Sequence, residues 1–114
     1  MHELGIVFHV INLVEDVAKE NELTKVTRVK LSLGEVSGVI PHYLSDCWQW
    51  AADKNDLLRG STLEIEELPA RTICNSCGKA YETVRYAKIC PHCGGDDTEL
   101  LQGNEVELKE IEAE

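Results

Sequence analysis

The sequence contains few aromatic residues and few basic residues, and its length is small. It is 114 residues long, and its aromatic residues are one Phe, two Trp and three Tyr. This length allows one compact domain or two very small ones, so a large catalytic scaffold is excluded. Basic residues are scarce, 11 against 21 acidic ones, and the net charge is -10. That balance argues against proteins that bind nucleic acid or anionic membranes through positive charge.

Long apolar runs and a targeting segment are also missing. No run of 18 apolar residues is present that would cross a membrane. The chain starts with Met1, His2 and Glu3, which places an acidic residue where a signal peptide carries positive charge. We therefore expect a cytosolic protein that binds neither nucleic acid nor membranes.

Apolar periodicity predicts an α+β fold, a small three-stranded sheet packed with two helices. Apolar residues recur every three or four positions in the two expected helices, the second of which starts at Pro41. They alternate with polar residues in the three expected strands, with a bulge before Ile111 in the last one. In chain order these elements are expected over 4–20, 26–34, 41–52, 62–66 and 105–112.

The stretch 70–103 differs in kind from the sequence on either side. It is rich in Cys, Gly and Asp, and it has too few large apolar residues for an ordinary hydrophobic core. Strands of one sheet are predicted before and after it, so we expect an insertion whose ends lie close together. The predicted domains are an α/β domain formed by 1–69 and 104–114, and an inserted zinc-binding domain at 70–103.

Four of the five cysteines form two Cys-x-x-Cys pairs separated by 12 residues, Cys74 with Cys77 and Cys90 with Cys93. Two intervening residues let a tight turn direct both sulfurs at one point, and the glycine after each pair is expected to take a positive φ. Four thiolates saturate a tetrahedral Zn²⁺ ion. The site is therefore expected to be a structural zinc-ribbon centre, since no position stays open for water or substrate.

Other interpretations of these residues remain. A redox Cys-x-x-Cys normally occurs once, on a strand-to-helix turn. A zinc ribbon that binds nucleic acid is a stronger alternative, although 70–103 has no excess of basic residues. His92 lies between ligands and is expected to face solvent, with a role in a metal site as the alternative. Cys47 is expected to be a small core residue on the apolar stripe of the second helix.

The first three residues are the sharpest local feature outside the cysteines. The amine of Met1 with the amide and imidazole nitrogens of His2 can close two chelate rings on one metal ion, and Glu3 can supply a fourth donor. Four planar nitrogen or oxygen donors suit Ni²⁺ or Cu²⁺ better than Zn²⁺. The alternative is an ordinary tail with a chance histidine. His9 and His42 are expected to be surface residues.

Together these features resemble the HypA/HybF family of hydrogenase nickel-incorporation proteins. The resemblance covers essentially the full length, through the start Met1-His2-Glu3-Leu4, the strand segments Leu33-Gly34-Glu35 and Leu63-Glu64-Ile65, and the two cysteine pairs. It implies a nickel metallochaperone that helps insert Ni²⁺ into the [NiFe] hydrogenase large-subunit precursor, with the GTPase HypB as partner. It implies His2 as the nickel ligand, assisted by Glu3 and Met1, with structural Zn²⁺ on Cys74, Cys77, Cys90 and Cys93.

Some properties stay open at this point. The resemblance fits a monomer or a homodimer, and service to hydrogenase alone or to urease as well. The sequence has no nucleophile elbow, phosphate-binding glycine loop or catalytic zinc motif, so we expect no enzyme activity. The competing functions are a metal-dependent hydrolase that uses His2 and Glu3, and a zinc-ribbon adaptor in transcription or RNA metabolism.

Overall fold

The computed structural model describes residues 3–114, so Met1 and His2 lie outside the described residues. The described chain forms two compact units. Unit 1 contains the residues up to Ser32, Val39–Glu66 and Glu107–Glu114, and unit 2 contains Leu33–Gly38 and Glu67–Val106. In chain order the elements are α1 (Glu3–Glu20), β1 (Val26–Gly34), α2 (Pro41–Ala52), β2 (Thr62–Leu68), β3 (Arg71–Cys74), β4 (Ala80–Glu82), α3 (Thr83–Tyr86), β5 (Thr98–Gln102) and β6 (Val106–Ala113). Within residues 3–114, no helix combines the length and apolar character that crossing a membrane requires.

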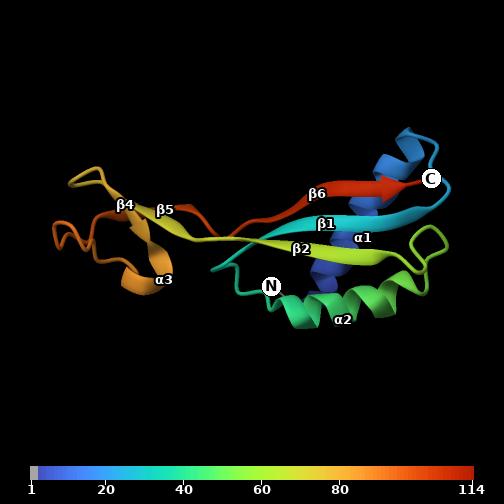
Figure 1. Cartoon of the computed structure of the whole chain (residues 1–114), viewed down its shortest axis with the longest axis horizontal. Coiled ribbons are helices and arrows are strands. Elements are labelled where there is room, and N and C mark those ends of the chain that lie inside the picture. Colours follow the sequence, from blue (N-terminus) through green and yellow to red (C-terminus); the bar gives the residue numbers. More distant parts are fainter. Residues whose placement is uncertain (1–2) are drawn as a thin grey trace. The chain divides into compact units, whose positions relative to one another are not determined.

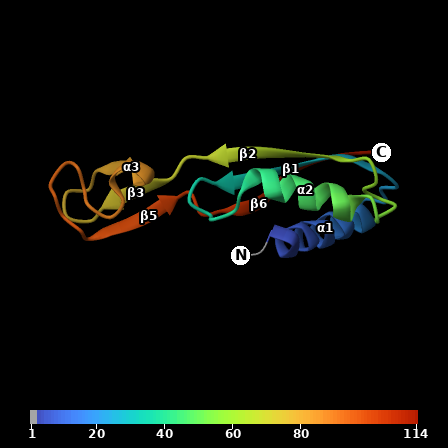
Figure 2. The ribbon, with the colours of Figure 1, turned by 90° about the horizontal axis from the view of Figure 1, so that it is seen from below.

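Unit 1 contains most of a three-stranded sheet with the strand order β2-β1-β6. β1 and β2 run in the same direction and are connected through α2 (Figures 1 and 2). β6 runs the opposite way, because Thr24 and Lys25, just before β1, exchange backbone hydrogen bonds with Glu114, just after β6. The predicted fold class, a small sheet with two helices, is confirmed.

Both long helices lie on one face of this sheet, as Figure 2 shows. α1 buries a stripe at the spacing of a helical face, consisting of Ile6, Val7, Val10, Ile11, Val14 and Ala18. α2 begins at Pro41, which suits the first helical turn, and buries Leu44, Trp48, Ala51 and Ala52. Val29 and Leu31 of β1 complete this core.

The predicted alternation in β1 fails at its first two residues. Val26 is buried and Thr27 is exposed, whereas strict alternation with Val29 and Leu31 predicts that Thr27 is buried and Val26 is exposed. The amide of Val26 donates to the carbonyl of Leu57 at 2.9 Å, so the segment after α2 covers Val26. The Thr27 hydroxyl instead donates to the backbone carbonyl of Glu112.

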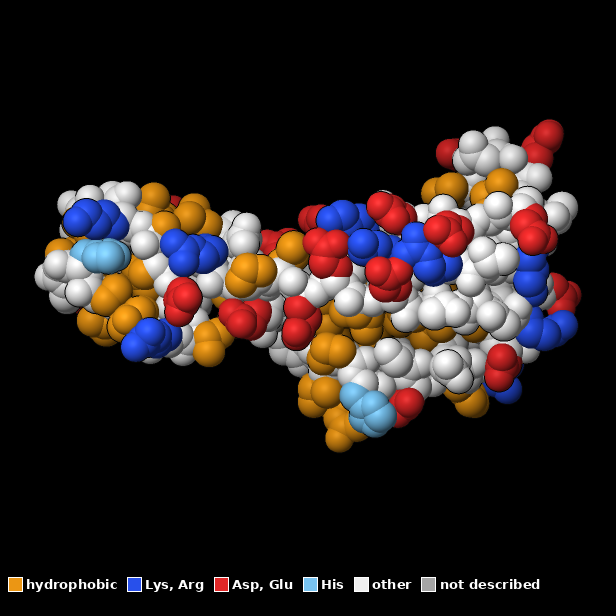
Figure 3. All heavy atoms as spheres, in the orientation of Figure 1, with side chains coloured by type: hydrophobic (Ala, Val, Ile, Leu, Met, Phe, Trp, Pro, Cys, Tyr) orange, Lys and Arg blue, Asp and Glu red, His pale blue; other side chains and the backbone are white. Residues whose placement is uncertain are grey.

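The other face of the β2-β1-β6 sheet carries a network of charged side chains, which Figure 3 shows gathered over these strands. Arg28 bonds Glu112 at 2.9 Å and also pairs with Glu64 and Glu110. On the same face Lys109 bonds Glu66 at 3.0 Å, and Lys30 lies 3.4 Å from Glu66. Hydrogen bonds from Lys109 and Arg28 respectively lower the pKa values of Glu66 and Glu112. Glu110 and Glu112 of the final strand thus lie on a solvated face and pair with Arg28.

Unit 2 is built around an antiparallel sheet with the order β4-β3-β5. Thr72 pairs with Tyr81 on one side and with Leu100 on the other, which places Tyr81 next to the cysteines. In the part of the chain that the structure describes, the buried hydrophobic cluster around the cysteines consists of Cys74, Tyr81 and Cys90. The Tyr81 hydroxyl donates to the carbonyl of Ala87 at 2.8 Å, and its ring meets the edge of Tyr86. This small core explains why the apolar pattern predicts no strand here.

Three segments of unit 2 approach one another closely at Gly34, Ala70 and Gly103. A Cβ atom at Gly34 would lie 2.0 Å from the carbonyl oxygen of Gly103, and one at Gly103 would lie 2.5 Å from the Cβ of Ala70. The Val36 amide donates to the Gly103 carbonyl at 2.7 Å, and the Ala70 amide donates to the Glu35 carboxylate at 3.0 Å. These contacts require the absence of a side chain at both glycines.

Candidate metal centre

Two similar turns position the four paired cysteines. In the first, the Gly78 amide donates to the Cys74 carbonyl at 2.8 Å, and in the second the Gly94 amide donates to the Cys90 carbonyl at 2.8 Å. Both glycines have a φ of +75°, a conformation that L side chains rarely adopt. The predicted positive φ after each cysteine pair is therefore confirmed.

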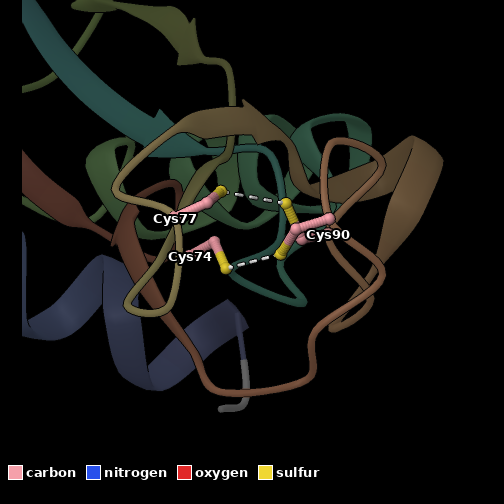
Figure 4. A group of neighbouring side chains, drawn as sticks. Cys74, Cys77 and Cys90 are labelled. Carbon is pink, nitrogen blue, oxygen red and sulfur yellow. Dashed lines mark hydrogen bonds between the residues drawn. The ribbon is translucent and has the colours of Figure 1, made fainter.

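The turns bring four sulfur atoms together, all within 4.8 Å of one another. The sulfurs face one another in two pairs, Cys74 with Cys93 at 3.6 Å and Cys77 with Cys90 at 3.7 Å. Figure 4 shows Cys77 and Cys90 pointing toward each other. A tetrahedron with metal–sulfur distances of about 2.3 Å has edges of about 3.8 Å. The spacing of the sulfurs and the all-thiolate donor set therefore fit a single tetrahedral ion of the Zn²⁺ type.

The centre has a buried side and an open side. Cys74 is 0% exposed and Cys90 is 1% exposed, and both pack against Tyr81. Cys77 and Cys93 are exposed. Each turn therefore contributes one sulfur to the core and one to the surface.

Backbone amides hydrogen-bond several of the sulfurs. The His92 amide donates to Cys90 Sγ and the Gly95 amide donates to Cys93 Sγ, each at 3.4 Å. A Cβ at Gly95 would lie 3.3 Å from Cys93 Sγ, so glycine allows this backbone to approach the sulfurs. The sequence pattern did not identify Gly95, because its requirement arises only from tertiary contact.

The pKa values of two of the cysteine thiols are shifted in opposite directions. Hydrogen bonds from the Cys77 backbone and then from Cys93 and Ser76 outweigh burial and lower the pKa of Cys74 to about 7. At Cys93 the Gly95 amide lowers the pKa, but hydrogen bonding with Cys74, burial and the other two sulfurs outweigh it and raise the pKa to about 11. Metal uptake at neutral pH must therefore release protons, since the bound ligands are thiolates.

The residues predicted for nickel lie at the other end of the sequence. Met1 and His2 lie outside the described residues, and Glu3 is the first residue of α1. Glu3 is half-buried and lines a shallow pocket of about 290 Å³ with Tyr43, Asp46 and Cys47. Proximity of Glu3 to α2 was not predicted, because the sequence pattern gives no sign of which ends of the two helices are neighbours.

The remaining candidate side chains are at the surface or its margin. His9, His42 and His92 are all exposed, as expected. Cys47 is only half-buried, so the prediction of a core thiol is wrong. The buried stripe of α2 runs through Leu44 and Trp48, and Cys47 lies at the edge of that stripe.

Comparison with known proteins identifies relatives along the whole chain. The family model described as "Hydrogenase/urease nickel incorporation, metallochaperone, hypA" matches residues 1–113. The hydrogenase maturation factor HypA of Albidiferax ferrireducens is 37% identical over 117 residues and that of Geobacter metallireducens is 36% identical over 114 residues. In both comparisons the match covers 100% of each chain.

Solved structures agree with this assignment. The solution structure of the Ni metallochaperone HypA from Helicobacter pylori superposes with a TM-score of 0.76 over 99% of this chain and 97% of that one, and its 24% identity supports the fold alone. A second solution structure of a HypA protein gives a TM-score of 0.75 at 25% identity, over 99% and 96% of the two chains. From the full-length family match and the close relatives, the chain belongs to the HypA family.

Proposed function

We propose that this protein is a nickel metallochaperone for the maturation of [NiFe] hydrogenase, and not an enzyme. The match of residues 1–113 to the nickel-incorporation family carries this proposal. The four-cysteine centre supports it, because such a coordinatively full site leaves no position for catalysis by its ion. The family description also names urease, so delivery to urease is the second candidate.

The four cysteines are proposed to hold Zn²⁺ in a structural role. Unit 2 has a buried cluster of only three residues, so packing alone contributes little to its stability. Binding of Zn²⁺ in small modules of this kind contributes on the order of 10 kcal/mol of folding free energy. The proposed inserted zinc-binding domain is 70–103, and the proposed nickel-binding domain is 1–69 with 104–114. Unit 2 is larger than this insertion, because it also contains Leu33–Gly38 and begins its longer segment at Glu67.

The nickel cargo is proposed to bind at the start of the chain. Its ligands are the imidazole and amide of His2, with assistance from the Met1 amine and Glu3. This donor set supports planar coordination, which Ni²⁺ accepts and Zn²⁺ disfavours. Glu3 lies in the first turn of α1 and lines a shallow surface pocket together with Asp46. A position at the surface supports release of the bound ion to a partner.

The proposed partners are a HypB-type GTPase and the hydrogenase large-subunit precursor, with the chaperone as a monomer or homodimer. The net charge of -10 supports an encounter steered by a basic surface on the partner. Four thiolates with one divalent ion add a net charge of about -2. Association with such a partner is therefore expected to slow as salt rises.

A nickel titration tests the proposal. Ni²⁺ added to the zinc-loaded protein should bind about one equivalent with the absorption of a planar complex. The His2→Ala variant, or an N-terminal extension that blocks the amine, should abolish this complex. His9→Ala is the matched control, because His9 is an exposed histidine on α1 that the proposal does not include among the nickel ligands. The His9→Ala variant should therefore bind nickel normally. Normal binding by His2→Ala and the extended protein would refute the N-terminal site.

A further inference from the structure

α2 carries a second apolar stripe in addition to the one that it buries. The buried stripe runs through Leu44 and Trp48. The second stripe consists of Tyr43, Cys47 and Trp50, which are spaced four and three residues apart and therefore share one helix face. Tyr43 and Trp50 are each 53% exposed, and Figure 3 shows hydrophobic side chains at the surface over this helix. An exposed Tyr and Trp on one stripe mark a surface that a partner can cover.

The exposed stripe continues onto the start of α1. Leu4 of α1 and Trp50 of α2 line one shallow pocket of about 270 Å³, and Glu3 and Tyr43 line another of about 290 Å³. Cys47 lines both pockets, so the two hollows are neighbours. We call this surface the apolar band, and its members are Leu4, Tyr43, Cys47 and Trp50.

The charged groups beside the apolar band favour a basic partner. Asp46 lines both pockets and Glu3 lines one of them. Among the described residues that line the two pockets, none is basic. Lys54 Nζ lies 4.7 Å from the centre of the Trp50 ring, so the exposed indole already interacts with one cation. Additional cations on a partner would meet two carboxylates and an aromatic face.

We propose that the apolar band is the docking site for a basic amphipathic helix of the hydrogenase large-subunit precursor. A helix that binds in a groove places apolar side chains into pockets, and its basic residues can pair with an acidic rim. The precursor is chosen over the GTPase because the recipient of nickel must approach Glu3, a proposed nickel ligand that lines the same surface. The inference therefore rests on the proposed function.

The two tryptophans of the chain allow a direct measurement at this surface. Zinc-loaded, nickel-free protein carrying 5-fluorotryptophan should give two ¹⁹F signals, and the Trp50→Phe variant assigns them. Unlabelled precursor is then added. The Trp50 signal should shift on binding because the ring loses contact with water, whereas Trp48, which is 1% exposed, should keep its chemical shift.

Substitutions test the same surface by calorimetric titration with the precursor. Tyr43→Ser and Trp50→Ser should each weaken binding at least about tenfold, because exposed aromatic residues dominate the binding energy of interfaces. Asp46→Lys should weaken binding and reduce its dependence on salt. Leu101→Ser is the matched control, since Leu101 is 56% exposed and lies outside the apolar band, and its effect should stay below about twofold. Circular dichroism checks that each variant is folded.

The outcomes separate this docking site from the proposed function. Precursor binding with an unchanged Trp50 signal, or equal losses in Trp50→Ser and Leu101→Ser, would overturn the docking site alone. A Trp50 shift with the GTPase but not with the precursor would also overturn it, as would a shift that depends only on the concentration of the chaperone and so reveals a second copy. Failure of the unmodified protein to bind the precursor would refute the proposed partner together with the docking site.

Discussion

At the scale of single residues, alanine substitutions at two glycines are expected to change the free energy of unfolding in opposite directions, because the surroundings of the two glycines differ. A Cβ at Gly34 would meet the Gly103 carbonyl at 2.0 Å, whereas a Cβ at Gly5 in α1 meets nothing within 4 Å. Gly34→Ala should lower the free energy of unfolding by about 1–3 kcal/mol through overpacking. Gly5→Ala should raise it by up to about 1 kcal/mol, because alanine favours the helix. Chemical unfolding of both variants, followed by circular dichroism, checks this pair. A neutral Gly34→Ala would contradict the close approach.

The two tryptophans of α2 give a second matched pair. Trp48 is 1% exposed and its indole N–H donates to the Ser61 hydroxyl at 3.1 Å, while Trp50 is 53% exposed. Trp48→Phe should cost about 1–3 kcal/mol, because it leaves a cavity and an unpaired buried hydroxyl. Trp50→Phe should change stability by less than about 0.5 kcal/mol. Urea unfolding followed by circular dichroism measures both, and equal costs would contradict the assigned helix faces.

Residue requirements were predictable from sequence only where they are local. The positive φ of Gly78 and Gly94 follows from the cysteine spacing, because the turn itself imposes it. Gly34 and Gly95 are required by segments far away in sequence, so no local pattern reveals them. The two cysteines of each pair belong to the first kind, because one turn positions both of them, whereas the approach of the two pairs within 4.8 Å is a tertiary contact.

At the scale of elements, the charged face of the β2-β1-β6 sheet makes stability depend on pH. The pKa values of Glu66 and Glu112 are lowered in the folded state by Lys109 and Arg28. Their contribution to stability is fully present above the unfolded carboxyl pKa of about 4.3 and is lost as pH falls through the lower folded values. Arg28→Gln should lower the melting temperature at pH 7 and weaken its decline in acid.

The matched control for this prediction is Arg59→Gln. Arg59 pairs with Asp56 at 2.9 Å in the segment after α2, away from the sheet face. Melting temperatures between pH 3 and 7 should therefore decline in this variant as in the unmodified protein. If the melting temperature of Arg28→Gln also declines with pH as in the unmodified protein, the network of charged side chains contributes nothing to the pH dependence.

Elements with a large apolar face were predictable, and those without one were not. The predicted helix 4–20 and strand 26–34 differ from α1 and β1 by one residue or none, because apolar residues recur along most of the length of both elements. β3, β4 and β5 contain three to five residues each and surround a buried cluster of three. Their sequences carry too few buried positions to produce a period.

At the scale of the whole molecule, metal removal should affect the two units differently. Cys74→Ala, or treatment with a strong chelator, should unfold unit 2, because its small core depends on the proposed ion. α1 and α2 belong to unit 1 and bury their own core, so helical circular dichroism should largely persist. Tyr81 lies beside the cysteines, so near-ultraviolet tyrosine signals report the loss.

Cys47→Ala is the control for this experiment, because Cys47 is a half-buried cysteine of α2 that does not belong to the four-sulfur cluster. Both the helical and the tyrosine signals should remain in this variant. Complete loss of helical signal in Cys74→Ala would mean that unit 1 cannot fold without the metal, contrary to the expected independence of the two units.

The close approach of Gly34 and Gly103 also determines where the crossover points in chimaeras of related proteins should lie. Unit 2 includes Leu33–Gly38 as well as Glu67–Val106, and the Glu35 and Val36 amides donate to the carbonyls of Leu68 and Gly103. A recombinant that exchanges only the longer segment would combine Gly34 from one parent with Gly103 from another. Exchange of both segments together would preserve the parental junction, so libraries for altered metal or partner preference should use paired crossover points.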